Sequence, residues 1–561
     1  MKKQLCSIIK QVSVLIVAVS ALAVGALAQS NTGSIVGVVQ DVNGSAIPGA
    51  TVTVTNVGTN DTKTVQANGE GYYEALSLPT GVYRIVGTAS GFADATLSDV
   101  RLAVGDRLRM DLQMGVGAVS ANVMVAAQTN VETETSTLGD TITSARVANV
   151  PVNGRDFTGL LSTVPGSVQT TNQFQTSING IPSTFGGSSV LVDGIDAGRV
   201  DLNGTSNVLG RIESRVNRVS MDSVQEVQVL EQNYSSQYGQ AIGTVINPIT
   251  KSGTNNFHGS VFDYFRNEAL DANDFFNNES GFPRNKFRLN QFGGNVSGPI
   301  VKDKLFFFGN YEGVRQTRGS LFRGFTPTAS FRTEFVPSLN AALATLPLPN
   351  TNNFLNVDAD PAFEYGEFRV LKNGKLREDT GSVKLDYQYN DRSQFSFRYN
   401  LNDSNTTTPY GVATDQTAEG SLRVQLLKLS HNYTLSSASV NEFAFGINRN
   451  VTNPGAGPSD LPIFNFLFAD SSIAGPGPAQ FNQFRTNNVY QFLDTFSTLK
   501  GNHSLKLGTD IRLNRRDAES VTQFTLFFFS GADFANAAAL LGQSSGNPKL
   551  SYANENYSFF V

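Results

Sequence analysis

Residues 381–402 read GSVKLDYQYNDRSQFSFRYNLN. Apolar and polar residues alternate on both sides of a turn at residues 391–393. This period of two predicts a β-hairpin with one apolar, aromatic face and one polar, partly charged face. A soluble sandwich would bury the apolar face, whereas a membrane barrel turns it to lipid and keeps the polar face for a wet lumen. The medium that touches Phe395 and Phe397 therefore decides both the fold and the function.

The same alternation recurs towards the C-terminus. Apolar side chains occupy alternate positions in three further stretches, residues 427–435, 443–447 and 505–513. Long polar or Pro/Gly-rich segments, such as residues 453–483, separate the hairpins. Short turns at one end and long loops at the other are typical of outer-membrane barrels. We therefore predict an antiparallel transmembrane β-barrel in residues 256–561.

The composition limits the alternatives. The chain has 561 residues, of which 40% are hydrophobic and 16% charged, so several domains are expected. After the N-terminus no apolar run reaches the ~18 residues of a membrane-spanning helix, but barrel strands are apolar on one face only. The net charge of −5 argues against nucleic acid as a partner. Trp is absent, so Tyr and Phe would have to form the aromatic belts at the membrane interfaces.

The first 28 residues have the pattern of an export signal. Lysines precede an uncharged apolar run, residues 12–28, which ends in the small-x-small sequence Ala26-Leu27-Ala28. We expect a cleaved signal peptide in residues 1–28, with a retained anchor helix as the alternative. Cys6 is the single cysteine, so the mature chain would contain no disulfide and no thiolate metal site.

Residues 33–115 predict a small β-sandwich, because short alternating strands are separated by Gly, Pro and Asn turns. Its motifs, in order, are SIVG at 34–37, PGA at 48–50, GYY at 71–73 and LPTGVY at 78–83. This series resembles the carboxypeptidase-regulatory-like domain. The resemblance implies a prealbumin-like fold, often classed with carbohydrate-binding-like domains, and an accessory role.

Residues 116–135 are small and polar, and we interpret them as a linker. The linker contains a β-prone tripeptide, Val123-Met124-Val125. The tripeptide could also be the last strand of the preceding sandwich or part of a plain tether.

Residues 136–255 mix short strands with helical stretches, which predicts an α+β domain. An ordered series of motifs begins here: NGRDF at 153–157, VDG at 192–194, TKSGTN at 250–255, FHGS at 257–260, GPI at 298–300 and FFF at 306–308. The series resembles a TonB-dependent outer-membrane receptor of the Oar-like branch, which has an N-terminal regulatory-like module, a plug and then a barrel. The resemblance implies that residues 136–255 are the plug. The expected fold class is therefore mainly β: a prealbumin-like β-sandwich, an α+β plug and an antiparallel transmembrane β-barrel.

The barrel is expected to be incomplete in this chain. A domain the size of the plug has a radius of gyration of roughly 13 Å, whereas a barrel of about 12 strands has a backbone radius of only about 12 Å. About 22 strands are needed to enclose the plug. Residues 256–561 are too few for that number, and residues 557–561 read as the middle of a strand. We predict a C-terminally truncated barrel, seen as an open sheet with unpaired edges or as a distorted closure.

Signals for catalysis and metal binding are weak. The histidines stand far apart, at His258, His431 and His503. None begins an H-E-x-x-H pattern, so no zinc peptidase site is expected. Three aspartates lack the spacing of a Ca²⁺ loop and are expected to serve in turns and caps: Asp193, Asp196 and Asp201. We expect no catalytic residue, no metal site and no cofactor, and predict that the chain is not an enzyme.

The resemblance implies import across the outer membrane. That membrane offers no ATP, so energy must come through the periplasm from an inner-membrane partner, a TonB-type protein. An extended segment before the plug adds as a strand to the partner's sheet edge. Val123-Met124-Val125 is the candidate for this segment, the TonB box. The other expected partners are outer-membrane lipid and an extracellular ligand of unidentified class, and residues 33–135 are expected in the periplasm.

Two other functions stay open. An outer-membrane-anchored adhesion or carbohydrate-binding protein would use the 33–115 sandwich as its binding module and the barrel as a passive anchor. A soluble secreted protein made of several sandwiches would instead bury Phe395, Phe397 and Leu505. The side of the membrane that holds the sandwich tests the first function, and the exposure of these side chains tests the second.

Overall fold

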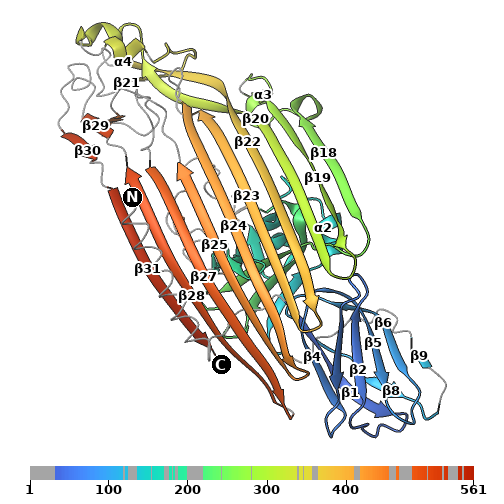
Figure 1. Ribbon diagram of the computed structural model, residues 1–561. Helices are drawn as coiled ribbons and strands as arrows, with labels where there is room; N and C mark the ends of the chain where they lie inside the picture. The colour runs from blue at the N-terminus through green and yellow to red at the C-terminus, as the bar shows by residue number, and fades with distance from the viewer. Residues whose placement is uncertain are drawn as a thin grey trace.

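The computed structural model describes residues 32–117, 121–123, 135–152, 154–169, 176–179, 181–182, 188–198, 219–239, 241, 243–279, 281–337, 340–344, 346–356, 364–409, 417–453, 463–466, 483–501, 503–520, 523–528, 541–545 and 549–560. These residues form three parts (Figure 1): a sandwich (residues 33–115), an inner domain (residues 136–255) and a large sheet that begins at His258.

In the part of the chain that the structure describes, the large sheet has 11 strands, and the strands of its main path pair in antiparallel fashion in chain order. The path consists of β18 (His258–Asn267), β19 (Phe287–Val301), β20 (Leu305–Pro327), β22 (Glu364–Asn390), β23 (Ser393–Pro409), β24 (Thr417–Ser436), β25 (Ser439–Asn453), β27 (Gln483–Lys500), β28 (His503–Ser520) and β31 (Lys549–Phe560), and β21 (Phe354–Asn356) pairs with β22. Within the described residues β18 and β31 are the two edges and do not pair with each other, so the sheet is open. The predicted open sheet is confirmed.

The two faces of the large sheet meet opposite surroundings. The register of β22 and β23 pairs Lys384 with Arg398 and Leu385 with Phe397, so each pair shares one face. Arg398 is 1% exposed, whereas the outward Phe395 is 42% exposed. A buried polar face and an exposed apolar face are the arrangement of a barrel wall in lipid. The predicted outward apolar face is confirmed, and the interpretation as a soluble multi-sandwich protein is wrong.

The two ends of the large sheet also differ. Two or three residues join β19 to β20, β22 to β23, β24 to β25 and β27 to β28, whereas the connections at the other end are much longer. The sandwich lies at the short-turn end (Figure 1). A small sheet of β26 (Ile463–Phe466), β29 (Gln523–Phe528) and β30 (Leu541–Ser545) lies at the long-connection end.

The sandwich consists of two β-sheets around an apolar core. One sheet contains β4 (Tyr72–Leu78), β1 (Gly33–Asp41), β7 (Arg107–Arg109) and β8 (Leu112–Met114). The other contains β3 (Thr62–Gln66), β2 (Thr51–Asn56), β5 (Gly81–Thr88), β6 (Ala95–Leu102) and β9 (Ala121–Val123). In β2 the valines Val52 and Val54 are buried while the alternating threonines are partly exposed, so the period of two in the sequence becomes a core face and a solvent face.

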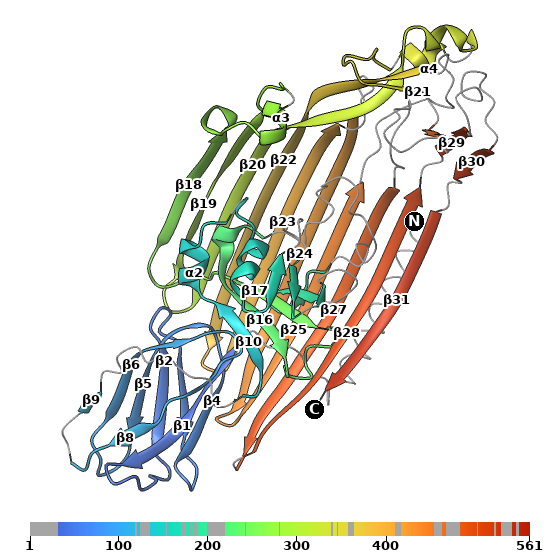
Figure 2. The ribbon, with the colours of Figure 1, turned by 180° about the vertical axis from the view of Figure 1, so that it is seen from behind.

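The inner domain is a mixed sheet with short helices, and it lies against the concave face of the large sheet (Figure 2). Its strands are, in order, β10 (Leu138–Ile142), β16 (Val224–Gln232), β17 (Thr244–Thr250), β14 (Ser188–Val192) and β15 (Ile195–Asp196). The accompanying elements are α2 (Ser144–Asn149), η1 (Phe157–Thr163), η5 (Met221–Ser223) and a sheet of β11 (Ser167–Gln169), β12 (Thr176–Ile178) and β13 (Ile181–Pro182). Every residue of β17 is buried. Its Ile246 lies in an apolar core that Leu422, Val424 and Leu426 of β24 close from the sheet side.

Short helices lie in the long connections: η6 (Glu268–Leu270), α3 (Phe275–Glu279), η7 (Phe331–Glu334) and α4 (Asn340–Ala344). Among the residues described above, no helix has the length and apolar character needed to cross a membrane.

Candidate functional site

The tight turn between β14 and β15 carries the first anchor of the inner domain. Asp193 and Gly194 both have positive φ, 47° and 78°, as a two-residue hairpin turn requires. The Gly194 amide donates to Asn247 Oδ1 at 3.0 Å. Thr250 holds the Asp193 carboxylate: its amide donates to Oδ1 at 2.8 Å and its hydroxyl to Oδ2 at 2.6 Å. The turn thus fixes the Asp193 carboxylate on the side of the inner domain that faces the large sheet, where it is buried.

Cations of the large sheet face this carboxylate. Arg398 Nη1 donates to Asp193 Oδ2 at 3.0 Å, and Lys428 Nζ donates to the Asp193 carbonyl oxygen at 2.8 Å. Burial acts to raise the pKa of Asp193, but the facing charges of Arg398, Lys384 and Lys428 outweigh burial and lower it. Asp193 is therefore an ionised group locked between two parts of the chain.

Asp196 of β15 forms the second anchor. Its partner on the large sheet lies in β28, four strands along the sheet path from β23. Arg512 Nη1 of β28 donates to Asp196 Oδ2 at 2.7 Å, and the Asp196 amide donates to Gln491 Oε1 at 2.8 Å. Gln491 and Arg512 both contact Asp510, with Gln491 Nε2 at 3.0 Å from Oδ1. Burial raises the pKa of Asp196 in spite of its guanidinium partner. Polar side chains of β27 and β28 are thereby bound to the same hairpin of the inner domain.

A third anchor joins the other side of the inner domain to β19 and β20. Ser220 Oγ donates to Glu312 Oε2 at 2.6 Å, and Gln291 Nε2 donates to Glu312 Oε1 at 2.7 Å. All three residues are buried. Together the contacts of the inner domain extend across the sheet from β19 to β28.

The sandwich is docked on the inner domain through the loop after β6. The Val104 amide donates to Glu226 Oε1 at 2.8 Å, and Gln228 Nε2 donates to the Val104 carbonyl at 3.1 Å. Gly105 has φ of 75°, and a Cβ there would lie 2.3 Å from Gln228 Nε2, so a larger residue would break the contact. Burial raises the pKa of Glu226 to about 7, and the nearby Asp106 adds to the shift.

The sandwich also contacts the short turns of the large sheet. Glu442 of β25 accepts hydrogen bonds from the Thr32 hydroxyl at 2.9 Å and from the Ser77 hydroxyl. Asn60 Nδ2 donates to Asp303 Oδ1 at 2.9 Å, in the turn between β19 and β20. The sandwich is therefore bound both to the inner domain and to the rim of the sheet.

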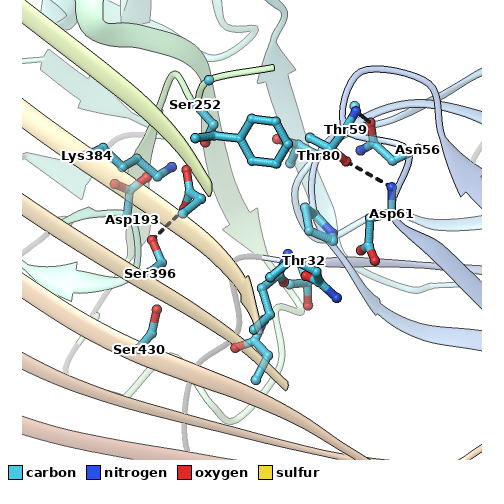
Figure 3. Close-up of a pocket in the computed structure, with 18 of the residues that line it drawn as sticks. Thr32, Asn56, Thr59, Asp61, Thr80, Asp193, Ser252, Lys384, Ser396 and Ser430 are labelled. Atoms are coloured by element: carbon cyan, nitrogen blue, oxygen red, sulfur yellow. Dashed lines mark hydrogen bonds between the residues drawn. The ribbon is translucent and has the colours of Figure 1, made fainter. Parts of the chain in front are cut away.

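A cavity of about 450 Å³ lies where these three parts meet (Figure 3). The large sheet and the inner domain contribute Asp193, Lys384, Arg398, Lys428, Ser396 and Ser430, and the sandwich contributes Asn56, Thr59, Asp61 and Thr80. In Figure 3, Lys384 and Asp193 lie on one side of the cavity and Asp61 lies on the other. The cavity walls combine apolar surface with charged groups of both signs.

The proposed interaction segment is described only in part. Val123 is the last residue of β9, which runs parallel to β6 with Val123 opposite Leu97. Met124 and Val125 lie outside the described residues. The pairing of β9 agrees with the alternative that the tripeptide begins in the last strand of the sandwich, and its role as a TonB box stays a prediction.

The candidate metal ligands do not come together. His258, His431 and His503 lie on β18, β24 and β28, and Asp193 and Asp196 are bound by arginines. Asp201 lies outside the described residues. The part of the chain that the structure describes contains no group of three or more His, Cys, Asp or Glu side chains placed to hold a metal ion.

Sequence reasoning missed the residues that bind the three parts to one another. Arg398, Lys428 and Arg512 stand on the polar face of predicted strands, where a charge is expected for a wet lumen. The signal that could have marked Arg398 is charge: it is the single cation on a face of its predicted strand otherwise occupied by uncharged polar residues. Arg512 had no such signal, because the same face of its strand also carries Lys506 and Asp510. No local signal marked Glu226, which lies in an ordinary alternating strand.

Two family models match the chain. One, described as an outer membrane beta barrel domain, matches residues 249–561, which is more than half of the chain. The other, described as a carboxypeptidase regulatory-like domain, matches residues 34–115.

Curated relatives match parts of the chain. It is 28% identical over 311 residues to the TonB-dependent transporter Oar of Myxococcus xanthus, which covers 53% of this chain and 28% of that protein. It is 35% identical over 98 residues to the probable TonB-dependent siderophore receptor PirA of Acinetobacter baumannii, which covers 17% of this chain and 11% of that protein. The chain thus spans under a third of the length of either relative.

Solved structures of outer-membrane proteins are also similar. The outer membrane transporter YddB from Escherichia coli has a TM-score of 0.49 at 14% identity, with 75% of this chain and 53% of that chain covered.

Proposed function

This chain belongs to the outer membrane beta barrel domain family and lies in the outer membrane, and from that premise we propose that it acts as a TonB-dependent receptor. The receptor imports an extracellular ligand with energy that a TonB-type partner delivers from the inner membrane. Because the relatives named above are a transporter and a receptor, we assign no catalytic activity to the chain.

The observation that carries the proposal is the way the inner domain is held. Ion pairs and hydrogen bonds at Asp193, Asp196 and Glu312 bind it to the polar face of the large sheet, beside an apolar contact with β24. Water can replace such polar contacts at a modest net cost, because the exchanged groups keep hydrogen-bond partners. A domain held in this way can block a lumen and still be moved, as a plug requires. In our proposal residues 136–255 are this plug.

The partner acts on the linker before the plug. Val123-Met124-Val125 is the proposed TonB box, which adds as a strand to the edge of the partner's sheet. Since β9 is already paired with β6, the partner has to displace this pairing before it can bind Val123. In our proposal residues 33–135 lie in the periplasm, an orientation supported by the short turns at the end that carries the sandwich.

Deletion of residues 120–128 tests the proposal. A knockout strain is first screened for solutes that it no longer accumulates, which identifies the ligand. In the complemented strain the deletion should abolish energy-dependent uptake of that ligand and leave its binding to the cell surface intact. The matched control replaces residues 129–135 of the same linker by Gly and Ser, and uptake should persist. Unchanged uptake in the deletion strain would rule out the transport mechanism.

A further inference from the structure

The cavity at the junction of the three parts is lined by charges of both signs. Its three cations, Lys384, Arg398 and Lys428, lie on the face of the large sheet that also carries Asp386, and Asp193 of the inner domain meets them on this side. Three further carboxylates belong to the lining: Asp61, Asp303 and Glu442. Charges removed from water are costly unless opposite charge or hydrogen bonds compensate them, so the hydrogen-bond partners of each charge show where a ligand is needed.

Both carboxylates on this side are already bound. Asp193 accepts from Thr250 and Arg398, as described above. Asp386 Oδ1 accepts from the Ser396 hydroxyl at 2.7 Å, the bond drawn beside Ser396 in Figure 3. Neither carboxylate uses the remaining donors of the cations.

Those remaining donors are numerous. Arg398 is 1% exposed, and its Nε and Nη2 have no hydrogen-bond partner among the described residues. An ammonium group has three donors. Lys384 Nζ donates to the Thr250 carbonyl at 3.2 Å and Lys428 Nζ to the Asp193 carbonyl at 2.8 Å, so both bonds go to neutral acceptors. The open donors of the Arg398 guanidinium form a planar fork that matches the oxygen atoms of a carboxylate or phosphate, and two ammonium groups lie beside it.

Two unpaired acceptors lie in the same wall. Asp386 Oδ2 and Gln388 Oε1 are buried and have no partner within the described parts of the chain. They suit a ligand that also presents an O–H group, such as a hydrogen phosphate or a hydroxy acid.

The other three carboxylates of the lining have their own hydrogen-bond donors or lie apart from the cations. Glu442 of β25 is bound by the Thr32 and Ser77 hydroxyls, and Asp303 accepts from the Asn60 and Asn255 side chains. Asp61 lies across the cavity from Lys384 (Figure 3). A volume of about 450 Å³ is within the range of small-molecule sites.

We propose that this cavity is a binding site for a small oxyanion, a phosphate or carboxylate group, held by Arg398, Lys384 and Lys428. The site lies beneath the inner domain, between it and the sandwich, at the short-turn end of the sheet. The ligand joins the large sheet to the inner domain and accepts hydrogen bonds from the open donors of Arg398. This binding depends on the folded cavity alone and goes beyond the proposed transport.

Titration of the purified full chain in detergent micelles tests the proposal, with inorganic phosphate and citrate as the two probes. At least one probe should bind, and the comparison of the two distinguishes a phosphate from a carboxylate site. Lys384→Gln should weaken binding at least about tenfold, because it removes a charge-assisted hydrogen bond. Lys375→Gln is the matched control: it makes the same change in the same strand at an exposed position and should leave binding unchanged.

A conservative variant separates loss of charge from loss of folding. Lys384→Arg keeps the positive charge and should bind the probe, and circular dichroism should show the same β-sheet signal for all variants. The proposal is overturned if neither probe binds the wild-type chain, if Lys384→Gln binds as tightly as wild type, or if Lys384→Arg binds as weakly as Lys384→Gln. Uptake is not measured, so a negative result leaves the transport proposal standing.

Discussion

Arg398 and Phe397 are consecutive residues of β23 that meet opposite surroundings. Arg398 is buried against Asp193 of the inner domain, while Phe397 turns to the outside of the sheet. A buried ion pair adds little net stability, because desolvation offsets the attraction, but removal of one partner leaves an uncompensated charge. The ion pair between Arg398 and Asp193 therefore holds the inner domain in place mainly because separation of the two groups would leave each charge without its partner.

Asp193→Ala tests this anchor. The variant should lower the free energy of unfolding by about 3–5 kcal/mol, because Arg398 is left buried without a counter-charge. Asp403→Ala is the control: its partner Arg423 is 58% exposed in the side chain, so the loss should stay below about 1 kcal/mol. Denaturant titration in detergent measures both, and the double variant Asp193→Ala/Arg398→Met should recover most of the loss. Equal losses for Asp193→Ala and Asp403→Ala would contradict the anchor.

Glu226 predicts a pH dependence of the contact between sandwich and inner domain. Burial raises its pKa from the ordinary 4.5 to about 7. A raised pKa in the folded state means that the stabilisation is fully present below pH 4.5 and is lost as the pH rises through about 7. The free energy of unfolding should fall across this window by at most about 3 kcal/mol.

Glu226→Gln should remove this pH dependence, because the amide does not titrate and can still accept from Val104. Glu231→Gln, a charge removal on the same strand β16, is the control in which the fall should persist. Unfolding curves at a series of pH values measure the slope. A slope that survives in Glu226→Gln would refute the assignment.

At the scale of elements, each strand of the large sheet separates two media. In β24, Leu429 is 45% exposed, while Leu426, on the other face, is 1% exposed in the core of the inner domain. The inward face is thus not uniformly polar: it is apolar where β24 meets the inner domain and polar where the cavity begins. The pairing of β9 with β6 also acts at the scale of elements, because β9 occupies the edge of β6 and Val123 is part of that pairing.

Phe397→Arg tests the outward face. An arginine near the middle of a lipid-facing strand costs about 2–4 kcal/mol, and near a membrane interface about 0–1 kcal/mol. Asn405→Arg, on the same face of β23 but nearer the long-connection end, is therefore the control. Refolding into lipid vesicles followed by denaturant titration compares the two. An equal cost at both positions would mean that the face does not lie in hydrocarbon.

At the scale of the whole molecule, the three parts meet at one junction. The sandwich contacts the inner domain at Glu226 and the rim of the sheet at Glu442 and Asp303. Movement of the inner domain out of the sheet would have to break or carry these contacts. In our proposal the sandwich therefore takes part in the opening of the receptor from the periplasmic side.

Protease access tests the orientation. A protease site inserted at Gly44, where even an added Cβ would touch nothing, should be cut only after the outer membrane is permeabilised. The same site inserted between Pro409 and Thr417, in a long connection, should be cut on intact cells. Cutting at Gly44 on intact cells would place the sandwich outside and favour the adhesion function.

Much of the architecture follows from local pattern. The alternation at residues 381–402 predicted both faces of β22 and β23, and the Gly, Pro and Asn turns of residues 33–115 predicted the sandwich. These features depend on neighbours within a few residues, where side-chain period and turn chemistry act. The open sheet was also predictable, because strand number and barrel radius are linked.

The amino-acid sequence by itself determined which strands form, which face of each is apolar and in what order the three parts follow. Only the tertiary structure decided which polar residues of the inward face meet a partner. Arg398 and Asp193 are 205 residues apart in the chain, and Arg512 and Asp196 are 316 apart. No local spacing in the sequence encodes such pairs. They form only when the large sheet curves around the inner domain and brings the two residues of each pair together.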